Sequence, residues 1–120
     1  MRDWIAVQER FLRDPFSVRL GGIAANLARV ASLAESPGGN AVVDTMLTES
    51  KYMIEWTALD GSIEVQADLV ELQVQLALWG LVWEHSQDPE VRQSISRHAR
   101  TWSNRVLAMS GLLGDATSPD

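Results

Sequence analysis

Apolar residues recur with a 4-3-4-3-4 spacing in three separate segments of the chain, and this spacing fixes the class of fold. Alternating steps of four and three keep side chains on one face of an α-helix. Helices with such faces and short connections are typical of antiparallel bundles with coiled-coil-like contacts. The three series are Phe16, Leu20, Ile23, Leu27, Val30 and Ala34; Val65, Leu69, Leu72, Leu76, Trp79 and Trp83; and Ile95, Ala99, Trp102, Val106, Met109 and Leu113.

Residues that start or stop helices set the predicted bounds. Asp14-Pro15 and Asp88-Pro89 each place an aspartate N-cap before a proline at the first helical position. Ser36-Pro37-Gly38-Gly39 ends one helix, Asn40 can cap the next, and Asp60-Gly61-Ser62 makes another break. The predicted helices are a short one over 3–13 and longer ones over 15–35, 41–58, 62–86 and 89–113.

The predicted fold is therefore all-α: an antiparallel bundle of four main helices with a short extra N-terminal helix. The 120 residues suffice for one domain with its own core. We expect a single helical-bundle domain over residues 1–114 and a flexible C-terminal tail over residues 115–120.

Composition excludes several functions. The chain has no cysteine, which removes disulfides, Cys-ligated metals and cysteine nucleophiles. The first fourteen residues are charged throughout, so we expect no secretory signal and a cytoplasmic location. The longest weakly polar run, from Val74 to Trp83, is far shorter than the ~20 residues of a bilayer span. A net charge of −6 argues against nucleic-acid binding, which needs clustered Lys and Arg.

The charge is unevenly distributed, because residues 40–90 carry ten acidic residues and one basic residue, Lys51. Residues 1–39 carry five arginines and four acidic residues, and residues 91–120 carry four arginines and two acidic residues. We expect these arginines to pair with the acidic middle helices; the alternative is an acidic face that meets a basic partner.

The helix predicted over 62–86 is apolar on two opposite sides. A second 4-3-4-3-4 series lies roughly 160° around the helix from the first. A helix with two apolar sides must be covered on both, either by the short N-terminal helix or by a second copy of the chain. About eleven residues of N-terminal helix cover only part of five turns, so we predict a homodimer. The second series is Ile63, Ala67, Val70, Val74, Ala77 and Leu81, and the expected dimer contacts are Val70, Val74, Ala77 and Leu81.

Small residues line one flank of the helix predicted over 15–35. Gly21 and Gly22 in mid-helix should each cost about 1 kcal/mol relative to alanine. We expect them to permit close contact with a neighbouring helix; a kink or a ligand gap is the alternative. The flank consists of Ser17, Gly21, Ala24, Ala28, Ala31 and Glu35.

No catalytic, cofactor or metal motif is present, so the sequence predicts neither an enzyme nor a bound cofactor. Neither His85 nor His98 follows a glutamate by three residues, which excludes ferritin-like di-metal chemistry. We expect His85 to interact with the C-terminus of its helix and His98 to be partly buried and hydrogen-bonded.

Five tryptophans in 120 residues is a high number. We interpret Trp79, Trp83 and Trp102 as core residues. Glu49, Tyr52 and Trp56 instead form a line on the far side of the helix predicted over 41–58. These three residues are either covered by the N-terminal helix or presented to a protein partner, and we retain them as a candidate partner-binding surface.

Three stretches, FLRDPFSVRLGGIAANLARV, ESKYMIEWTA and LVELQVQLALWGLVWE, resemble segments of small uncharacterised cyanobacterial helical proteins. The resemblance implies a cytoplasmic helical protein without an assigned activity. We therefore predict a non-catalytic interaction or scaffold module that self-associates through helix 62–86. The alternative is a small-molecule or pigment-binding bundle with a pocket near Gly21, Gly22, Trp79 and Trp83.

Overall fold

Breaks rich in glycine, proline and small polar residues separate five α-helices in the computed structural model, which describes residues 3–36 and 38–112. All predicted helices are present, with bounds within one to three residues of the expected ones, and the described residues contain no strand. The tail predicted over 115–120 lies outside the described residues. The elements are α1 (Trp4–Leu12), α2 (Phe16–Ala34), α3 (Asn40–Thr57), the 3₁₀ turn η1 (Ala58–Asp60), α4 (Ile63–His85) and α5 (Pro89–Ser110).

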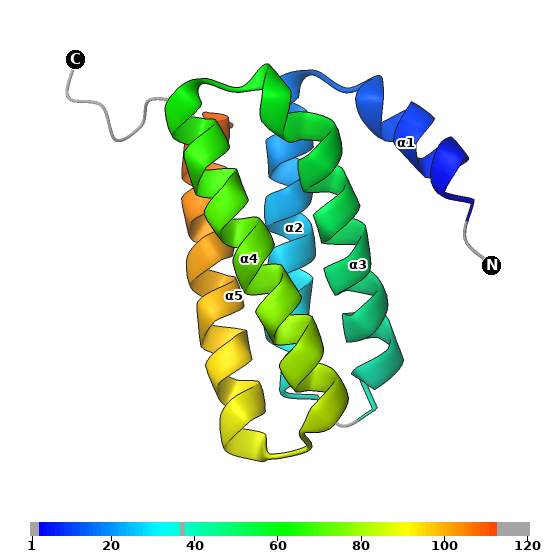
Figure 1. The fold of residues 1–120 in the computed structure, drawn as a ribbon, viewed down its shortest axis with the longest axis vertical. Helices are drawn as coiled ribbons and strands as arrows, with labels where there is room; N and C mark the ends of the chain where they lie inside the picture. Colours follow the sequence, from blue (N-terminus) through cyan, green and yellow to red (C-terminus); the bar gives the residue numbers. More distant parts are fainter. Residues whose placement is uncertain (1–2, 37, 113–120) are drawn as a thin grey trace.

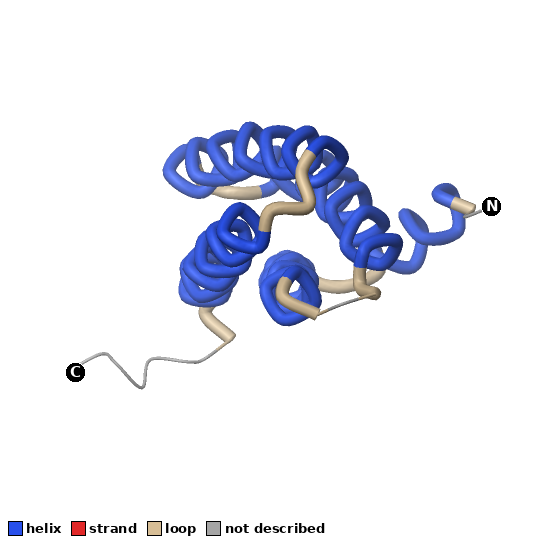
Figure 2. The backbone as a smooth tube through the Cα atoms, turned by 90° about the horizontal axis from the view of Figure 1, so that it is seen from below, coloured by secondary structure: helices blue, strands red, loops and turns tan. Residues whose placement is uncertain are grey.

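The helices form a compact globule in which α2 packs against α3 and α5, and α4 packs against the same two helices. Seen along the helices, α2 and α4 lie on opposite sides, with α3 and α5 between them (Figure 2). Helix α4 crosses obliquely in front of α3 and α5, and α1 projects beside α3 (Figure 1). The radius of gyration is 14.5 Å, close to the roughly 14 Å of a folded chain of this length.

Of the three predicted helix caps, one is formed and two are not. Asp88 caps α5 by accepting a 2.9 Å hydrogen bond from the Glu90 amide, ahead of a proline at the first helical position. Asp14 does not cap α2, because Pro15 takes the N-cap position. Asn40 does not cap α3 either: it lies inside the helix, and its side-chain oxygen accepts a 2.6 Å hydrogen bond from Arg92. The prediction at Asp14 failed for a local reason, the neighbouring proline, and the one at Asn40 failed because Asn40 makes a tertiary contact.

The small-residue flank of α2 contacts α5, as predicted. Two buried serines of α5 donate hydrogen bonds to main-chain oxygens of α2: Ser103 to Ala24 at 2.7 Å, and Ser96 to Ala31 at 2.6 Å. Side chains this short reach the opposite backbone only where the two helices lie very close. A Cβ atom on Gly21 would lie 2.5 Å from Leu112 Cδ1, so its missing side chain also makes room for a neighbour.

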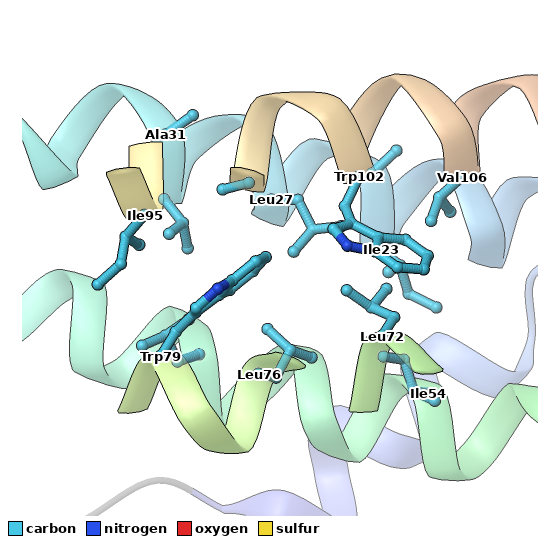
Figure 3. Close-up of a cluster of buried hydrophobic side chains, with 14 of the residues drawn as sticks. Ile23, Leu27, Ala31, Ile54, Leu72, Leu76, Trp79, Ile95, Trp102 and Val106 are labelled. Carbon is cyan, nitrogen blue, oxygen red and sulfur yellow. The ribbon is translucent and has the colours of Figure 1, made fainter. Parts of the chain in front are cut away.

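The core lies between α2 on one side and α4 on the other, closed by α3 and α5 (Figure 3). Trp79, Trp83 and Trp102 are buried, which confirms their interpretation as core residues. Trp83 also donates its indole N–H to the Asn40 main-chain oxygen at 3.2 Å, and the Arg92 guanidinium stacks on its ring.

Candidate functional site

Helix α4 buries one of its two apolar sides and exposes the other. The inner stripe includes Leu69, Leu72 and Leu76, which are fully buried against the core (Figure 3). The outer stripe, defined as Ile63, Ala67, Val70, Val74, Ala77 and Leu81, is exposed along its whole length. Its large members are 81% (Ile63), 60% (Val70), 55% (Val74) and 58% (Leu81) exposed.

The outer stripe widens toward α5 through two residues that the spacing analysis missed. Leu78 is 50% exposed and Val82 is 38% exposed. Both line a groove of about 250 Å³ between α4 and α5, whose floor includes Trp79 and Ile95. Leu78 lies four residues after Val74, so an i, i+4 search from the outer stripe could have found it. We call the outer stripe together with Leu78 and Val82 the outer face of α4.

The N-terminal helix does not cover the outer face. Helix α1 packs on α3, where the Trp4 ring lies 4.6 Å from Tyr52 and the Phe11 ring lies 5.8 Å from Trp56, measured between centroids. Of the two covers considered from the sequence, α1 is therefore excluded within the described residues. Such a large exposed apolar patch is typical of an interaction site.

The candidate partner surface Glu49, Tyr52 and Trp56 is the place where α1 lies. Trp56 is half-buried and stacks on Tyr52 at 5.8 Å. The carboxylate of Glu49 accepts a 2.9 Å hydrogen bond from the Asn26 side chain. Helix α1 thus contacts Tyr52 and Trp56, while Tyr52 stays 37% exposed, and the role of the three residues as a partner surface stays a prediction.

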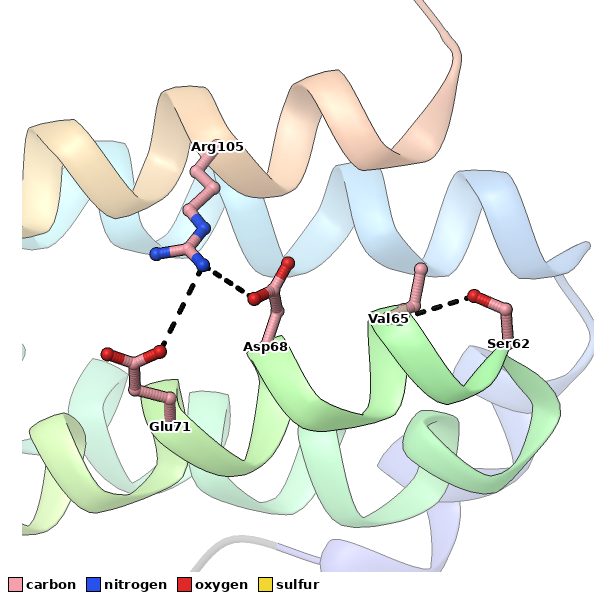
Figure 4. A network of polar contacts seen from close by, with 5 residues as sticks. All are labelled: Ser62, Val65, Asp68, Glu71 and Arg105. Carbon is pink, nitrogen blue, oxygen red and sulfur yellow. Dashed lines mark hydrogen bonds and ion pairs between the residues drawn. The ribbon is translucent and has the colours of Figure 1, made fainter.

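Charged residues flank the outer face on the side of α5. Arg105 forms an ion pair with Asp68, and its guanidinium lies 4.0 Å from the Glu71 carboxylate (Figure 4). Arg19 of α2 pairs with Asp60 at 2.9 Å. These contacts confirm that arginines of the first and last long helices pair with the acidic middle of the chain. On the other flank, the Gln73 amide donates to the Lys51 main-chain oxygen at 3.0 Å.

The two histidines behave differently from one another. His85 Nδ1 lies 2.8 Å from the Leu81 main-chain oxygen in the last turn of α4, as expected for an imidazole at a helix C-terminus. His98 Nδ1 is likewise hydrogen-bonded, to the Ser94 main-chain oxygen at 2.7 Å, but the residue is exposed. The prediction of a partly buried His98 is wrong, because this residue lies at the rim of the groove between α4 and α5.

The pocket predicted near Gly21, Gly22, Trp79 and Trp83 is not formed. The glycines lie near the start of α2, where a Cβ on Gly22 would meet Met53 and Phe11. The tryptophans lie near the end of α4, and that end is at the opposite end of the molecule from the start of α2 (Figure 1). Helices α2 and α4 begin at the same end, so their glycines and tryptophans cannot line one cavity.

The described residues hold neither a metal-binding cluster nor a helix suited to crossing a membrane. No three His, Asp or Glu side chains there gather in a geometry suited to a metal ion. None of the described helices combines the length and the apolar character that crossing a bilayer requires. The outer face of α4 is thus the most distinctive surface of the described chain.

Comparisons with protein-family models, curated proteins and solved structures found no match to the chain. The resemblance to small cyanobacterial helical proteins stays a prediction. The fold and its exposed helix face define an all-helical protein with an unpartnered apolar surface, and the function must be argued from that surface.

Proposed function

We propose that this protein is a non-catalytic interaction or scaffold module that self-associates as a homodimer through α4. In this proposal the four long helices form an antiparallel bundle, α1 is an accessory helix on α3, and the protein acts in the cytoplasm. One observation carries the proposal: the outer face of α4 is aliphatic and exposed in the single chain. The dimer contacts are Val70, Val74, Ala77 and Leu81 at its centre.

The amount of exposed aliphatic surface supports a dimer of moderate affinity. The exposed fractions of the six large aliphatic residues on the outer face add up to between three and four whole side chains. Burying that surface contributes roughly 5–10 kcal/mol for each copy. Association itself costs on the order of 4–15 kcal/mol. The balance allows a micromolar dissociation constant, which corresponds to about −8 kcal/mol.

Sedimentation velocity over a concentration series around the micromolar range tests the proposal. We expect wild-type protein to shift from monomer to dimer, and the variant Val74→Glu to remain monomeric. The reason is that an unpaired carboxylate buried in an apolar contact costs several kcal/mol. The matched control is Val42→Glu on α3, because Val42 is 47% exposed and lines a groove with Arg29 of α2. A wild-type protein that stays monomeric throughout would remove the proposal.

A further inference from the structure

We infer that the two copies pair through α4 in antiparallel orientation about a two-fold axis, with Val70 of one copy opposite Val74 of the other. This inference rests on the proposed self-association and adds the orientation and the register. In this arrangement the numbers of two facing residues add up to 144. Ala67 therefore faces Ala77 of the partner copy, and Ile63 faces Leu81.

The outer stripe reads the same in both directions by spacing and by side-chain size. From the start of α4 its residues are Ile, Ala and Val, and from the end they are Leu, Ala and Val. The spacing of 4-3-4-3-4 is also unchanged when it is reversed. A two-fold axis that reverses α4 onto itself thus places large residues opposite large ones and small opposite small. Such self-complementarity is required of an interface formed by the same surface on both copies.

The order of sizes also suits two helices that cross. Packed helices cross at an angle, so they are closest at the crossing point and diverge toward their ends. Alanine and valine occupy the central part of the outer stripe, from Ala67 to Ala77, where the helices must approach closely. Ile63 and Leu81 lie farther out, each about 13 Å along the axis from the centre. Their longer side chains fill the wider gap.

The arrangement of α4 in the fold leaves this approach open. Helix α4 lies on the outside of the group formed by α2, α3 and α5, and none of the described helices lies beyond it (Figures 1 and 2). The chain therefore presents the full length of the outer stripe. Eighteen residues separate Ile63 from Leu81, which gives a contact about 27 Å long.

Charge favours the antiparallel over the parallel orientation. Residues 63–85 contain one side chain that can be positive, His85, and it lies in the last turn. Glu64, Asp68 and Glu71 lie in the first half of α4, and Glu84 lies beside His85 in the last turn. Parallel pairing would place the acidic halves together. Antiparallel pairing places the half of each α4 that has three acidic residues beside the half of the other that has only Glu84, and opposes the two helix dipoles.

Glu71 is the exception, because it lies one residue from the centre and approaches Glu71 of the other copy. Arg105 of the same copy pairs more closely with Asp68, and its guanidinium lies 4.0 Å from the Glu71 carboxylate. Because Asp68 offsets the charge of Arg105, the antiparallel arrangement leaves a contact between like charges at the two Glu71 side chains near the axis.

Disulfide trapping tests the orientation, and the absence of cysteine provides a clean background. An affinity-tagged Ala67→Cys chain is mixed with an untagged Ala77→Cys chain at a concentration where wild-type protein is dimeric. The mixture is then oxidised. We expect a mixed disulfide dimer of tagged and untagged chains. Each variant alone should give no disulfide dimer. In the antiparallel dimer the two identical cysteines are offset by ten residues, which separates them by about 15 Å along the helix. Cα atoms joined by a disulfide lie only about 4.4–6.8 Å apart. Ala25→Cys mixed with Ala108→Cys is the matched control from exposed positions on α2 and α5.

The outcomes separate this inference from the proposed function. Disulfide dimers of each variant alone, without mixed dimers, would mean parallel pairing: self-association through α4 would stand and the antiparallel inference would be overturned. A third outcome is that the wild-type protein sediments as a dimer, Val74→Glu disrupts this dimer, and no disulfide forms above the level of the control. This outcome would overturn the register alone. A monomer by sedimentation together with no trapping would remove both.

Discussion

Ser103 of α5 donates a 2.7 Å hydrogen bond to the main-chain oxygen of Ala24 in α2, inside the contact between the two helices. Seven residues along each helix, Ser96 and Ala31 repeat the same relationship. The two hydrogen bonds fix the antiparallel register of α2 and α5. They also show that the backbones approach closely enough for a serine hydroxyl to reach the opposite chain.

The first prediction concerns this contact. Ala24→Leu should lower the free energy of unfolding by about 1–3 kcal/mol, because a larger side chain must force the two helices apart. Ser103→Ala should cost only about 1 kcal/mol, since it removes one hydrogen bond and leaves the spacing unchanged. Urea denaturation followed by circular dichroism measures both. Ala25→Leu, at the exposed neighbouring position of α2, is the control and should be nearly neutral.

Two glycines should respond in opposite ways to replacement by alanine. A Cβ on Gly39 would lie 2.7 Å from the main-chain oxygen of Leu33, which cannot move without distorting the end of α2. We therefore expect Gly39→Ala to destabilise the fold by about 1–3 kcal/mol. A Cβ on Gly80 would meet nothing within 4 Å, so Gly80→Ala should stabilise α4 by about 1 kcal/mol. Equal effects of the two substitutions in thermal denaturation would contradict this account.

Much of the fold could be predicted because the signals were local. The 4-3 spacing identified the buried side of α4, and the glycine and alanine flank of α2 identified its close contact with α5. The cap prediction at Asp14 was wrong by one residue, because Pro15 takes the N-cap position, and the prediction at Asn40 failed because Asn40 binds Arg92, a contact that depends on packing. The sequence likewise showed that α1 has an apolar side without showing which neighbour it would contact.

The candidate site could be predicted in part for the same reason. The outer stripe followed from periodicity alone, but its exposure depended on where α1 lies. Leu78 and Val82 were missed because they lie beside the stripe and not within its spacing. The partner surface at Tyr52 and Trp56 could not be separated from an internal contact, since exposed and covered aromatic residues have the same pattern.

Helix α1 should be attached to the molecule by its aromatic contacts. It contains no fully buried residue, and nine residues are too few for an isolated helix to be stable in water. Trp4→Ala removes the ring that lies on Tyr52, so we expect hydrogen exchange of the α1 amides to accelerate strongly while exchange in α2 to α5 is unchanged. Ile5→Ala, at a position that is 71% exposed, should leave exchange in α1 nearly as in wild type. Equal acceleration throughout the chain in Trp4→Ala would contradict a local role.

The antiparallel pairing predicts that removing the negative charge of Glu71 increases the affinity of the dimer. Glu71 approaches its counterpart in the partner copy, and like charges at a partly exposed contact repel by roughly 0.2–1 kcal/mol. Glu71→Gln should therefore tighten the dimer by about two- to fivefold at low salt, and the gain should shrink as salt screens the repulsion. Glu64→Gln is the control on the same flank, because in this register Glu64 faces Gly80 of the other copy and not its own counterpart, so its neutralisation should not tighten the dimer. Sedimentation equilibrium at two salt concentrations measures both constants, and a larger gain from Glu64→Gln than from Glu71→Gln would indicate that the acidic halves of the two α4 helices lie together.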